Sequence, residues 1–454
     1  MNKALTVFLS SSSLRARFGS GFLFSLLATS FNGGSTLLVN IIIANLLGRK
    51  VFGEFAIVQN TILTLSSVAS LANGFTATKY VAEYRSVDKE KTGRILGLCS
   101  SLSLVMGSAF TIVLFFGAPW LAEVVLKASH LSTGLMLAAA AVFFNVNNFY
   151  QTGVLAGLEG YPAIARAGMI GGTMYFILCA GASTIWGLEG ALVGLAISGG
   201  IQWLALRFFL QRECSRQGIV VNYRSMGKER NIFFTFAMPA ALSGFSTMPA
   251  LWLANTLLVQ QSGGYIQMAL YAAANNLRVL GLLLPGLLNN VAMSLLNNAR
   301  GLGEMERYRK VFWGNLAVTT GVALVGGTII ALIGPTLLTF FGRNFREGYP
   351  ILLVLMGAML AEALMLAIYQ VVQSQGRIWL SFFIITLPRD WTIVLLAYLL
   401  TPTHGAMGLA LAYSIGCGLG LLATGMTVWA LSRSVATDLH RLSNNASLEG
   451  PKTS

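Results

Sequence analysis

The sequence predicts an all-α integral membrane protein with about 12 transmembrane helices in two pseudo-symmetric six-helix bundles. Three observations predict this fold class. Of the 454 residues, 55% are hydrophobic and only 10% are charged, whereas a soluble domain has about 25% charged residues. Apolar runs of about 20 residues, the length that crosses a hydrocarbon core of about 30 Å, recur along the chain. The basic residues are concentrated in the short segments between these runs.

Twelve apolar runs are long enough to cross a bilayer. Their ranges are 18–46, 55–75, 95–116, 131–153, 168–186, 191–210, 232–258, 269–296, 311–334, 350–372, 378–400 and 406–430. We therefore expect an N-terminal cytoplasmic segment, two bundles, a basic cytoplasmic linker between them and a cytoplasmic tail. In chain order these parts are 1–17, 18–210, 211–231, 232–430 and 431–454.

The abundance of Lys and Arg alternates from loop to loop. With the N-terminus placed in the cytoplasm, 23 of the 30 basic residues fall in cytoplasmic segments and five in external loops. The five external ones are Arg49, Lys50, Lys127, Arg343 and Arg346. Because cytoplasmic loops of membrane proteins are rich in Lys and Arg, this pattern predicts both termini in the cytoplasm. The net charge of +14 then reflects topology and contacts with anionic lipids, and it does not indicate nucleic-acid binding.

The sequence also argues against an enzyme or a metal protein. No loop exceeds about 25 residues, which leaves no room for an extramembrane catalytic domain. The four cysteines lack the spacing of a disulfide or metal motif. His130 and His404 fall in predicted external loops and His440 in the tail, so we interpret them as surface residues. No nucleophile, base and orienting group occur together, and no cofactor is expected.

A weak internal repeat relates the two predicted bundles. Residues 55–60 (FAIVQN) resemble 271–276 (YAAANN), 216 positions later. The segment GALVGLA, which begins at Gly190, resembles GAMGLA at Gly405, an offset of 215 with one residue slipped. Because each half has an even number of spans, both halves insert with the same orientation around an axis along the membrane normal. The cleft between them is the expected transport pathway.

Several motifs resemble a known family. Residues 45–55 (NLLGRKVFGEF) look like the LG-x-x-x-FG-x-F signature of the bacterial polysaccharide transporter family, residues 79–85 (KYVAEYR) like its AEY-type turn, and residues 155–161 (LAGLEGY) like a further motif after the fourth span. This family contains the lipopolysaccharide O-antigen flippases. It belongs to a superfamily that also includes multidrug exporters and the lipid II flippase.

The resemblance implies a fold and a function. The two bundles would form a V around a central cavity that opens alternately to each side of the membrane. The substrate class would be an oligosaccharide repeat unit on an undecaprenyl pyrophosphate carrier, moved to the periplasmic leaflet of the bacterial cytoplasmic (inner) membrane. The implied partners are this lipid-linked oligosaccharide, membrane lipids and, as candidates, other proteins of surface-polysaccharide assembly.

Four charged residues fall near the middle of predicted spans. Arg278 lies about 14 Å along its span, and Glu362, Arg389 and Asp390 lie at similar depths in theirs. An ionised side chain at the bilayer centre costs about 2.5 to 3.5 kcal/mol, so each one needs an explanation. One hypothesis is that Arg278 and Arg389 bind an anionic pyrophosphate or sugar carboxylate through forked hydrogen bonds. The alternative is that the four residues form ion pairs that stabilise the second bundle.

Amides and prolines accompany these charges. Asn145, Asn148 and Asn275 lie within predicted spans, where they are candidates either for binding sugar hydroxyls or for hydrogen bonds between helices. Four prolines are also inside predicted spans and permit kinks. They are Pro239, Pro249, Pro285 and Pro388. Three of them lie in the seventh and eighth spans, so we expect bending to be concentrated there.

Two other functions remain open from sequence. A cation-coupled multidrug exporter shares the architecture, but such exporters generally have a carboxylate in the first span, and residues 18–48 contain no Asp or Glu. A membrane-embedded polysaccharide polymerase or ligase shares the hydropathy, but it is expected to have a large external loop. For coupling to a H⁺ or Na⁺ gradient, the candidates are Glu362 and Asp390, of which Glu362 is preferred because Asp390 adjoins Arg389.

Overall fold

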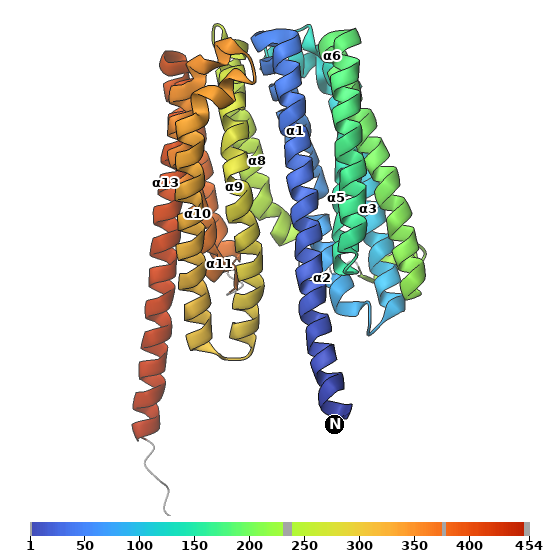
Figure 1. Ribbon diagram of the computed structural model, residues 1–454, viewed down its shortest axis with the longest axis vertical. Helices are drawn as coiled ribbons and strands as arrows, with labels where there is room; N and C mark the ends of the chain where they lie inside the picture. Colours follow the sequence, from blue (N-terminus) through green and yellow to red (C-terminus); the bar gives the residue numbers. More distant parts are fainter. Residues whose placement is uncertain (1, 230–237, 375–377, 449–454) are drawn as a thin grey trace, which may run out of the picture.

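The computed structural model describes residues 2–229, 238–374 and 378–448, and every regular element in these ranges is helical (Figure 1). Seven of the described helices are long and apolar enough to cross a membrane. The protein is therefore an all-helical, multi-pass membrane protein. Several helices are longer than one crossing requires, since a straight helix of 57 residues would extend about 85 Å.

The helices fall into two halves along the chain. The first half contains α1 (Asn2–Ser70), α2 (Asn73–Tyr84), α3 (Lys89–Trp120), a π-helical turn (Leu121–Val125), α4 (Leu131–Ala138), α5 (Ala140–Gly157) and α6 (Tyr161–Gln217). A 3-10 turn (Met226–Glu229) leads to the second half, with α8 (Met238–Val259), α9 (Gly264–Gly301), α10 (Met305–Thr339), a 3-10 turn (Arg343–Gly348), α11 (Tyr349–Ser374), α12 (Ile378–Ser381), a π-helical turn (Phe382–Thr386) and α13 (Leu387–Leu448).

Helices α6 and α13 are each broken by a glycine in the same conformation. Gly187 has φ 56° and ψ −131°, and Gly405 has φ 53° and ψ −130°. Only glycine adopts such angles readily. Beyond each break the chain folds back closely on itself, because a Cβ on Gly190 would lie 2.1 Å from the carbonyl oxygen of Ala182 and one on Gly408 would lie 2.4 Å from that of Leu400. Each break therefore forms a helical hairpin.

These hairpins correct the repeat register that the sequence suggested. The equivalent residues are Gly187 and Gly405, which are 218 positions apart, and not Gly190 and Gly405. The sequence comparison matched two glycines of different function. Gly405 allows the positive φ of the break, whereas Gly190 allows close approach of the two arms, as Gly408 does in the second half.

Helix breaks also differ from the positions that the prolines suggested. Pro249 and Pro285 lie inside α8 and α9, whereas the non-helical angles within the long helices are at Gly48, Trp186, Gly187 and Gly405. The chain reversals are therefore at glycines, while the expected bending at the prolines of the seventh and eighth spans stays a prediction. A proline can remain in a membrane helix when neighbouring groups satisfy the freed carbonyl, but reversing the chain needs the positive φ that glycine tolerates.

The helices are longer than the predicted spans. Helix α3 exceeds the predicted span 95–116 at both ends, and α6 runs to Gln217, into the predicted linker. The predicted span 55–75 is interrupted by Leu71 and Ala72, which have positive φ, before α2 continues to Tyr84. Residues 232–237 of the predicted span 232–258 lie outside the described residues.

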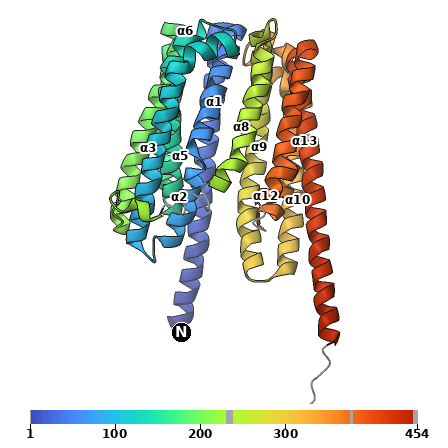
Figure 2. The ribbon, with the colours of Figure 1, turned by 180° about the vertical axis from the view of Figure 1, so that it is seen from behind.

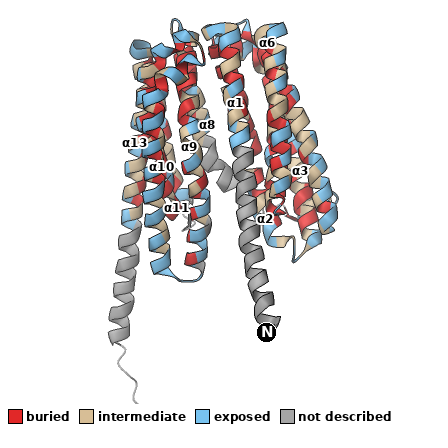
Figure 3. Cartoon of the chain, in the orientation of Figure 1, coloured by how far each residue is buried: buried red, intermediate tan, exposed pale blue. Residues whose placement is uncertain are grey.

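The two halves stand side by side, with α1 to α6 in one group and α8 to α13 in the other (Figures 1 and 2). Helix α1 packs against both α8 and α9 and so joins the two groups. The first residues of α1 and the last of α13 lie at the same end of the molecule. We call the opposite end the outer end. Buried residues gather along helix faces that meet within each half (Figure 3), while large apolar side chains such as Phe116, Leu332 and Trp391 are exposed as expected for a lipid-facing surface.

Candidate substrate site

Arg278 of α9 is the centre of a buried polar network in the second half. Its Nε donates to Asn275 Oδ1, one turn earlier, at 2.9 Å, and its Nη1 pairs with the Glu362 carboxylate of α11. The Tyr413 hydroxyl of α13 donates to the same Glu362 oxygen at 3.0 Å, and its ring centroid lies 4.7 Å from the guanidinium carbon. Three helices thus converge on one ion pair. Of this network, the sequence did not single out Tyr413, because an aromatic residue in an apolar run carries no polar signal.

Arg389 and Asp390 form a second network. The Asp390 Oδ1 accepts from Arg389 Nε at 2.9 Å and from Nη2 at 2.6 Å. Thr247 of α8 donates to Asp390 Oδ2 and accepts from Arg389 Nη2, each at 2.9 Å. Side chains of adjacent helical residues point about 100° apart, but the Arg389 side chain is long enough to contact the Asp390 carboxylate. Because Asp390 is only 1% exposed, this pair holds an otherwise costly buried charge.

The two networks are neighbours on α13. Gly416, one turn after Tyr413, lies against Arg389, because a Cβ there would lie 3.5 Å from the Arg389 carbonyl oxygen. A Cβ on Gly420 would lie 3.0 Å from Arg389 Cδ, so this glycine makes room for the arginine stem. The structure therefore brings together Arg278, Glu362, Arg389 and Asp390, the four charged residues that the sequence singled out. Their formal charges cancel, so an anion can bind an arginine here only if a carboxylate gives way or is neutralised.

The two ion pairs differ in exposure. The Glu362 side chain is 21% exposed and that of Asp390 is 1% exposed. The protein encloses Asp390 almost completely, whereas part of the Glu362 side chain reaches the protein surface. Neutralising this carboxylate would leave Arg278 with only the amide of Asn275 and the face of Tyr413 as partners, whereas Arg389 would keep its ionised neighbour.

Asn145 and Asn148 lie in the first half, on α5, away from these charges. Asn145 donates to Ser66 Oγ at 3.4 Å, and Asn148 donates to the Gly199 carbonyl of α6 at 3.1 Å. Each of these contacts joins two helices of the first half. The Asn148 side chain still has a buried oxygen without a partner, which is the atom available to a hydroxyl donor. Only Asn275 is part of the charged networks.

A buried carboxylate in the first half was missed from the sequence. Glu54 of α1 is 4% exposed, and its Oε1 lies 2.9 Å from Nε2 of His130. The predicted second span began at residue 55, so Glu54 counted as a loop residue. His130 is a surface residue as expected, with 56% of its side chain exposed, but its pairing with Glu54 was not predicted. Spans predicted from hydropathy omit polar residues at helix ends. In addition, Glu54 and His130 are 76 residues apart, so nothing in the sequence indicates that they pair.

Contacts between the two halves are present at the outer end. Tyr265 and Gln260 of the second half donate to the carbonyls of Leu126 and Val125, at 2.8 and 2.7 Å. A Cβ on Gly53 would lie 1.9 Å from the Tyr265 carbonyl oxygen, so α1 and α9 are in backbone contact there. Farther along α1, Trp252 Nε1 donates to Thr61 Oγ1 at 2.9 Å. We call this set of contacts the outer seam.

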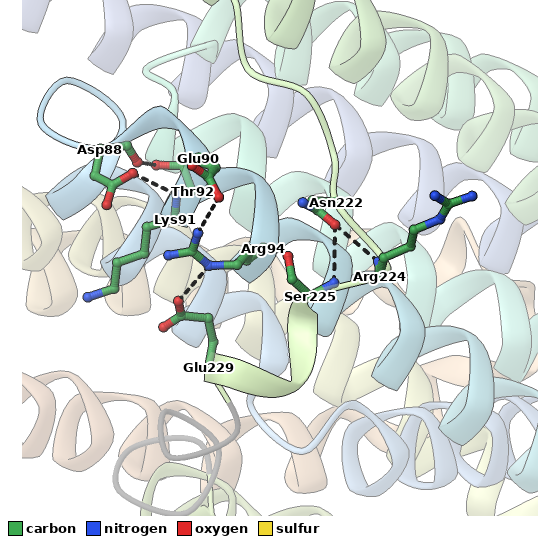
Figure 4. Close-up of polar contacts among 9 residues, drawn as sticks. All are labelled: Asp88, Glu90, Lys91, Thr92, Arg94, Asn222, Arg224, Ser225 and Glu229. Carbon is green, nitrogen blue, oxygen red and sulfur yellow. Dashed lines mark hydrogen bonds and ion pairs between the residues drawn. The ribbon is translucent and has the colours of Figure 1, made fainter.

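The segment that joins the halves is docked on α3 (Figure 4). Arg94 of α3 donates to Glu229 at 3.0 Å and to Glu90 at 2.9 Å. The backbone N–H of Asn222 donates to the Gly93 carbonyl at 3.0 Å. The side-chain oxygen of Asn222 accepts from the backbone N–H groups of Arg224 and Ser225. The predicted linker is therefore partly ordered, with residues 218–229 fixed to the first half.

Taken with the fold, this site defines a class of protein. The chain is an all-helical, multi-pass membrane protein with ion pairs buried among its helices. Among the described residues, no three His, Cys, Asp or Glu side chains converge as metal ligands would. The family model for polysaccharide biosynthesis proteins matches residues 18–296, more than half of the chain. The chain belongs to this family. No curated protein matches it.

Solved structures of transporters share the fold. The inward-facing conformation of a multidrug resistance MATE family transporter of the MOP superfamily has a TM-score of 0.74 at 19% identity, covering 88% of this chain and 96% of that one. The outward-facing conformation of such a transporter has a TM-score of 0.67 at 19% identity, over 91% and 94%. A MOP superfamily transporter from Pyrococcus furiosus, described as having a binding pocket of reverse polarity, has a TM-score of 0.64 at 18% identity, over 91% and 94%.

Proposed function

We propose that the protein is a flippase for oligosaccharides linked to undecaprenyl pyrophosphate, such as O-antigen repeat units. It carries them from the cytoplasmic to the periplasmic leaflet of the bacterial inner membrane by alternating access. The observation that carries this proposal is membership of the polysaccharide biosynthesis family, combined with two buried arginines in a transporter fold. An arginine in a membrane interior suits a diphosphate, because its planar fork binds phosphate oxygens in pairs.

The proposal includes a topology of twelve spans. We divide α1 at Gly48, α6 at Gly187 and α13 at Gly405. With α2 taken as the continuation of α1, α4 and α5 as one span, and α12 as the start of α13, each half has six segments. The matched hairpins at Gly187 and Gly405 support two pseudo-symmetric bundles. Both termini lie at one end of the molecule, as an even number of spans requires. The Lys and Arg distribution supports a cytoplasmic location for this end.

The charged networks suggest how binding is coupled to a proton gradient. Protonation of Glu362 would remove the counter-ion of Arg278 and leave the guanidinium free for the diphosphate of the substrate. Return of the proton would restore the ion pair and expel the anion. Asp390 would stay ionised and hold Arg389, so that the second arginine stabilises the bundle and adds positive potential. Asn145, Asn148 and Asn275 are proposed contacts for sugar hydroxyls.

A multidrug exporter is the competing function because the solved neighbours include such exporters. Two buried arginines disfavour a cationic drug, and the first 48 residues contain no Asp or Glu. The test is the location of lipid-linked oligosaccharide in a strain that lacks the protein. Accumulation on the cytoplasmic face is expected. Accumulation on the periplasmic face would contradict the flippase, since the block would then follow translocation.

A further inference from the structure

Four basic residues gather at the outer end, where the two halves meet. Arg49 and Lys50 directly follow the break at Gly48 in α1, and Arg343 and Arg346 belong to the 3-10 turn Arg343–Gly348 of the second half. Arg49 Nη1 bonds to Glu347 at 3.1 Å, which brings the two segments together. We call Arg49, Lys50, Arg343 and Arg346 the outer basic cluster.

A second contact fixes the same segments. Asn45 donates its side-chain amide to the Phe340 carbonyl at 2.5 Å. Phe52 packs on Phe341 and Phe345, with ring centroids 5.9 Å away in each case. The basic residues of the cluster therefore surround an apolar contact between the halves and do not lie on separate loops.

The hydrogen-bonding capacity of Arg49 is largely unused. Its Nε and Nη2 are buried without a partner, although its guanidinium lies 5.6 Å from the Phe345 ring centroid. Buried N–H groups without acceptors are costly and uncommon in native proteins. The one acceptor, Glu347, is 70% exposed, and ion pairs with exposed partners contribute little stability.

The outer basic cluster has more positive charges than the single ion pair between its two segments uses. Residues 45–54 and 340–348 contain four basic residues and two acidic ones, Glu347 and Glu54, and Glu54 contacts His130. Among the described residues, Lys50, Arg343 and Arg346 form no ion pair. Like charges on opposite sides of a contact repel each other, so the surplus weakens the closed state. This surplus of basic residues is also an exception to the rule that external loops contain few Lys and Arg residues.

We propose that the outer basic cluster is an exit site for the diphosphate group of the lipid-linked substrate. This inference rests on the proposed flippase function. Arg49 and Glu347 belong to different halves, so separation of the halves at the outer end breaks their ion pair. The released guanidinium then exchanges a single carboxylate contact for paired contacts with phosphate oxygens. The substrate thereby favours the open state and gains a binding site on the side where it leaves. Headgroups of anionic phospholipids have related chemistry, and the experiment separates them from the substrate.

The test is photoaffinity labelling of the full chain in nanodiscs of neutral phosphatidylcholine, with a benzophenone-tagged prenyl diphosphate as the probe. Labelled peptides are mapped by mass spectrometry. We expect label on peptides from 45–53 or 340–348 in the parent. The variant Arg343→Ala/Arg346→Ala should lose about tenfold in labelling there, since each removed charge-assisted contact weakens binding substantially. Arg343→Lys/Arg346→Lys should retain part of it, and Lys127→Ala, which changes another exposed basic residue of this end, should match the parent.

Three results would overturn the exit site. They are undiminished labelling in the double alanine variant, equal labelling by the corresponding uncharged prenyl alcohol, and loss of labelling when phosphatidylglycerol replaces part of the phosphatidylcholine. The last would assign the cluster to phospholipid headgroups. A parallel assay of oligosaccharide translocation by the parent distinguishes the two levels of the proposal. Translocation without labelling at the outer end would contradict the exit site alone. Labelling without translocation would contradict the flippase function.

Discussion

At the residue scale, the proposed function depends on two ion pairs that differ in burial. Arg278 pairs with the partly exposed Glu362, and Arg389 with the buried Asp390. Removing one partner of a buried pair leaves an uncompensated charge, which destabilises a protein by about 3 to 5 kcal/mol. The two pairs should therefore respond differently to substitution, the first in transport and the second in stability.

Arg278→Ala should abolish transport while the protein level stays near that of the parent, because this change removes the proposed diphosphate contact. Arg278→Lys should restore part of the activity, since it keeps the charge and loses the fork. Export of surface polysaccharide by the complemented strain, with immunoblots of the membrane fraction, measures both. An alanine variant as active as the parent would show that Arg278 does not bind substrate.

Glu362→Gln should remove the response of transport to an imposed pH gradient, because the glutamine cannot gain or lose the proton that frees Arg278. Vesicles with reconstituted parent and variant, with and without the gradient, measure this response. If the parent responds and the variant responds equally, Glu362 is only a structural partner of Arg278.

Asp390→Asn should lower stability, by about 3 to 5 kcal/mol if the Arg389 charge is left unpaired. The double variant Arg389→Gln/Asp390→Asn should recover much of the loss, because it removes both charges together. Thermal unfolding in detergent compares the three proteins. A single variant as stable as the parent would mean that water or lipid already compensates Arg389.

At the element scale, glycines determine where long helices reverse and how closely their arms pack. Gly187 and Gly405 adopt the same positive φ, and Gly190 and Gly408 bring each hairpin's arms together. The sequence predicted helices correctly wherever apolar residues are continuous. The sequence could not distinguish a glycine that allows a chain reversal from one that allows close packing. Both occur in the same short motif, and hydropathy contains no information about the backbone angle φ.

Gly408→Ala should destabilise the α13 hairpin by about 1 to 3 kcal/mol, the usual cost of overpacking, since the new methyl group would lie 2.4 Å from the Leu400 carbonyl oxygen. Gly418→Ala on the same helix is the matched control, because nothing lies within 4 Å of its Cβ position. The measurement is again the unfolding temperature in detergent. Equal temperatures for the two variants would contradict the close packing of the hairpin arms.

At the scale of the whole molecule, the two halves are joined at the outer end by contacts that must break if the transporter opens on that side. Gln260 bonds to the Val125 carbonyl at 2.7 Å across the outer seam. A Val125→Cys/Gln260→Cys pair should be joined by a short bifunctional methanethiosulfonate reagent and stop transport, and reduction should restore it. Each single cysteine variant is the control. Transport that continues in the fully cross-linked protein would show that the outer seam does not open.

The architecture was more predictable than the site. Apolar runs and the Lys/Arg alternation suffice for a multi-pass helical protein, and charge at membrane depth suffices to select Arg278, Glu362, Arg389 and Asp390. Their pairing could not be derived, because it depends on how α9, α11 and α13 are rotated against each other. The Glu54–His130 pair stayed hidden for a similar reason, as its partners are 76 residues apart and lie at predicted span ends.

The central claim is that the protein moves a lipid-linked oligosaccharide across a bilayer, and translocation in a purified system tests it most directly. Vesicles with reconstituted protein receive a fluorescent undecaprenyl-pyrophosphate oligosaccharide in one leaflet, and an impermeant quencher reports how much reaches the other. We predict translocation with the parent and none with Arg278→Ala or with protein-free vesicles. A parent no faster than protein-free vesicles under an imposed ion gradient would contradict the account.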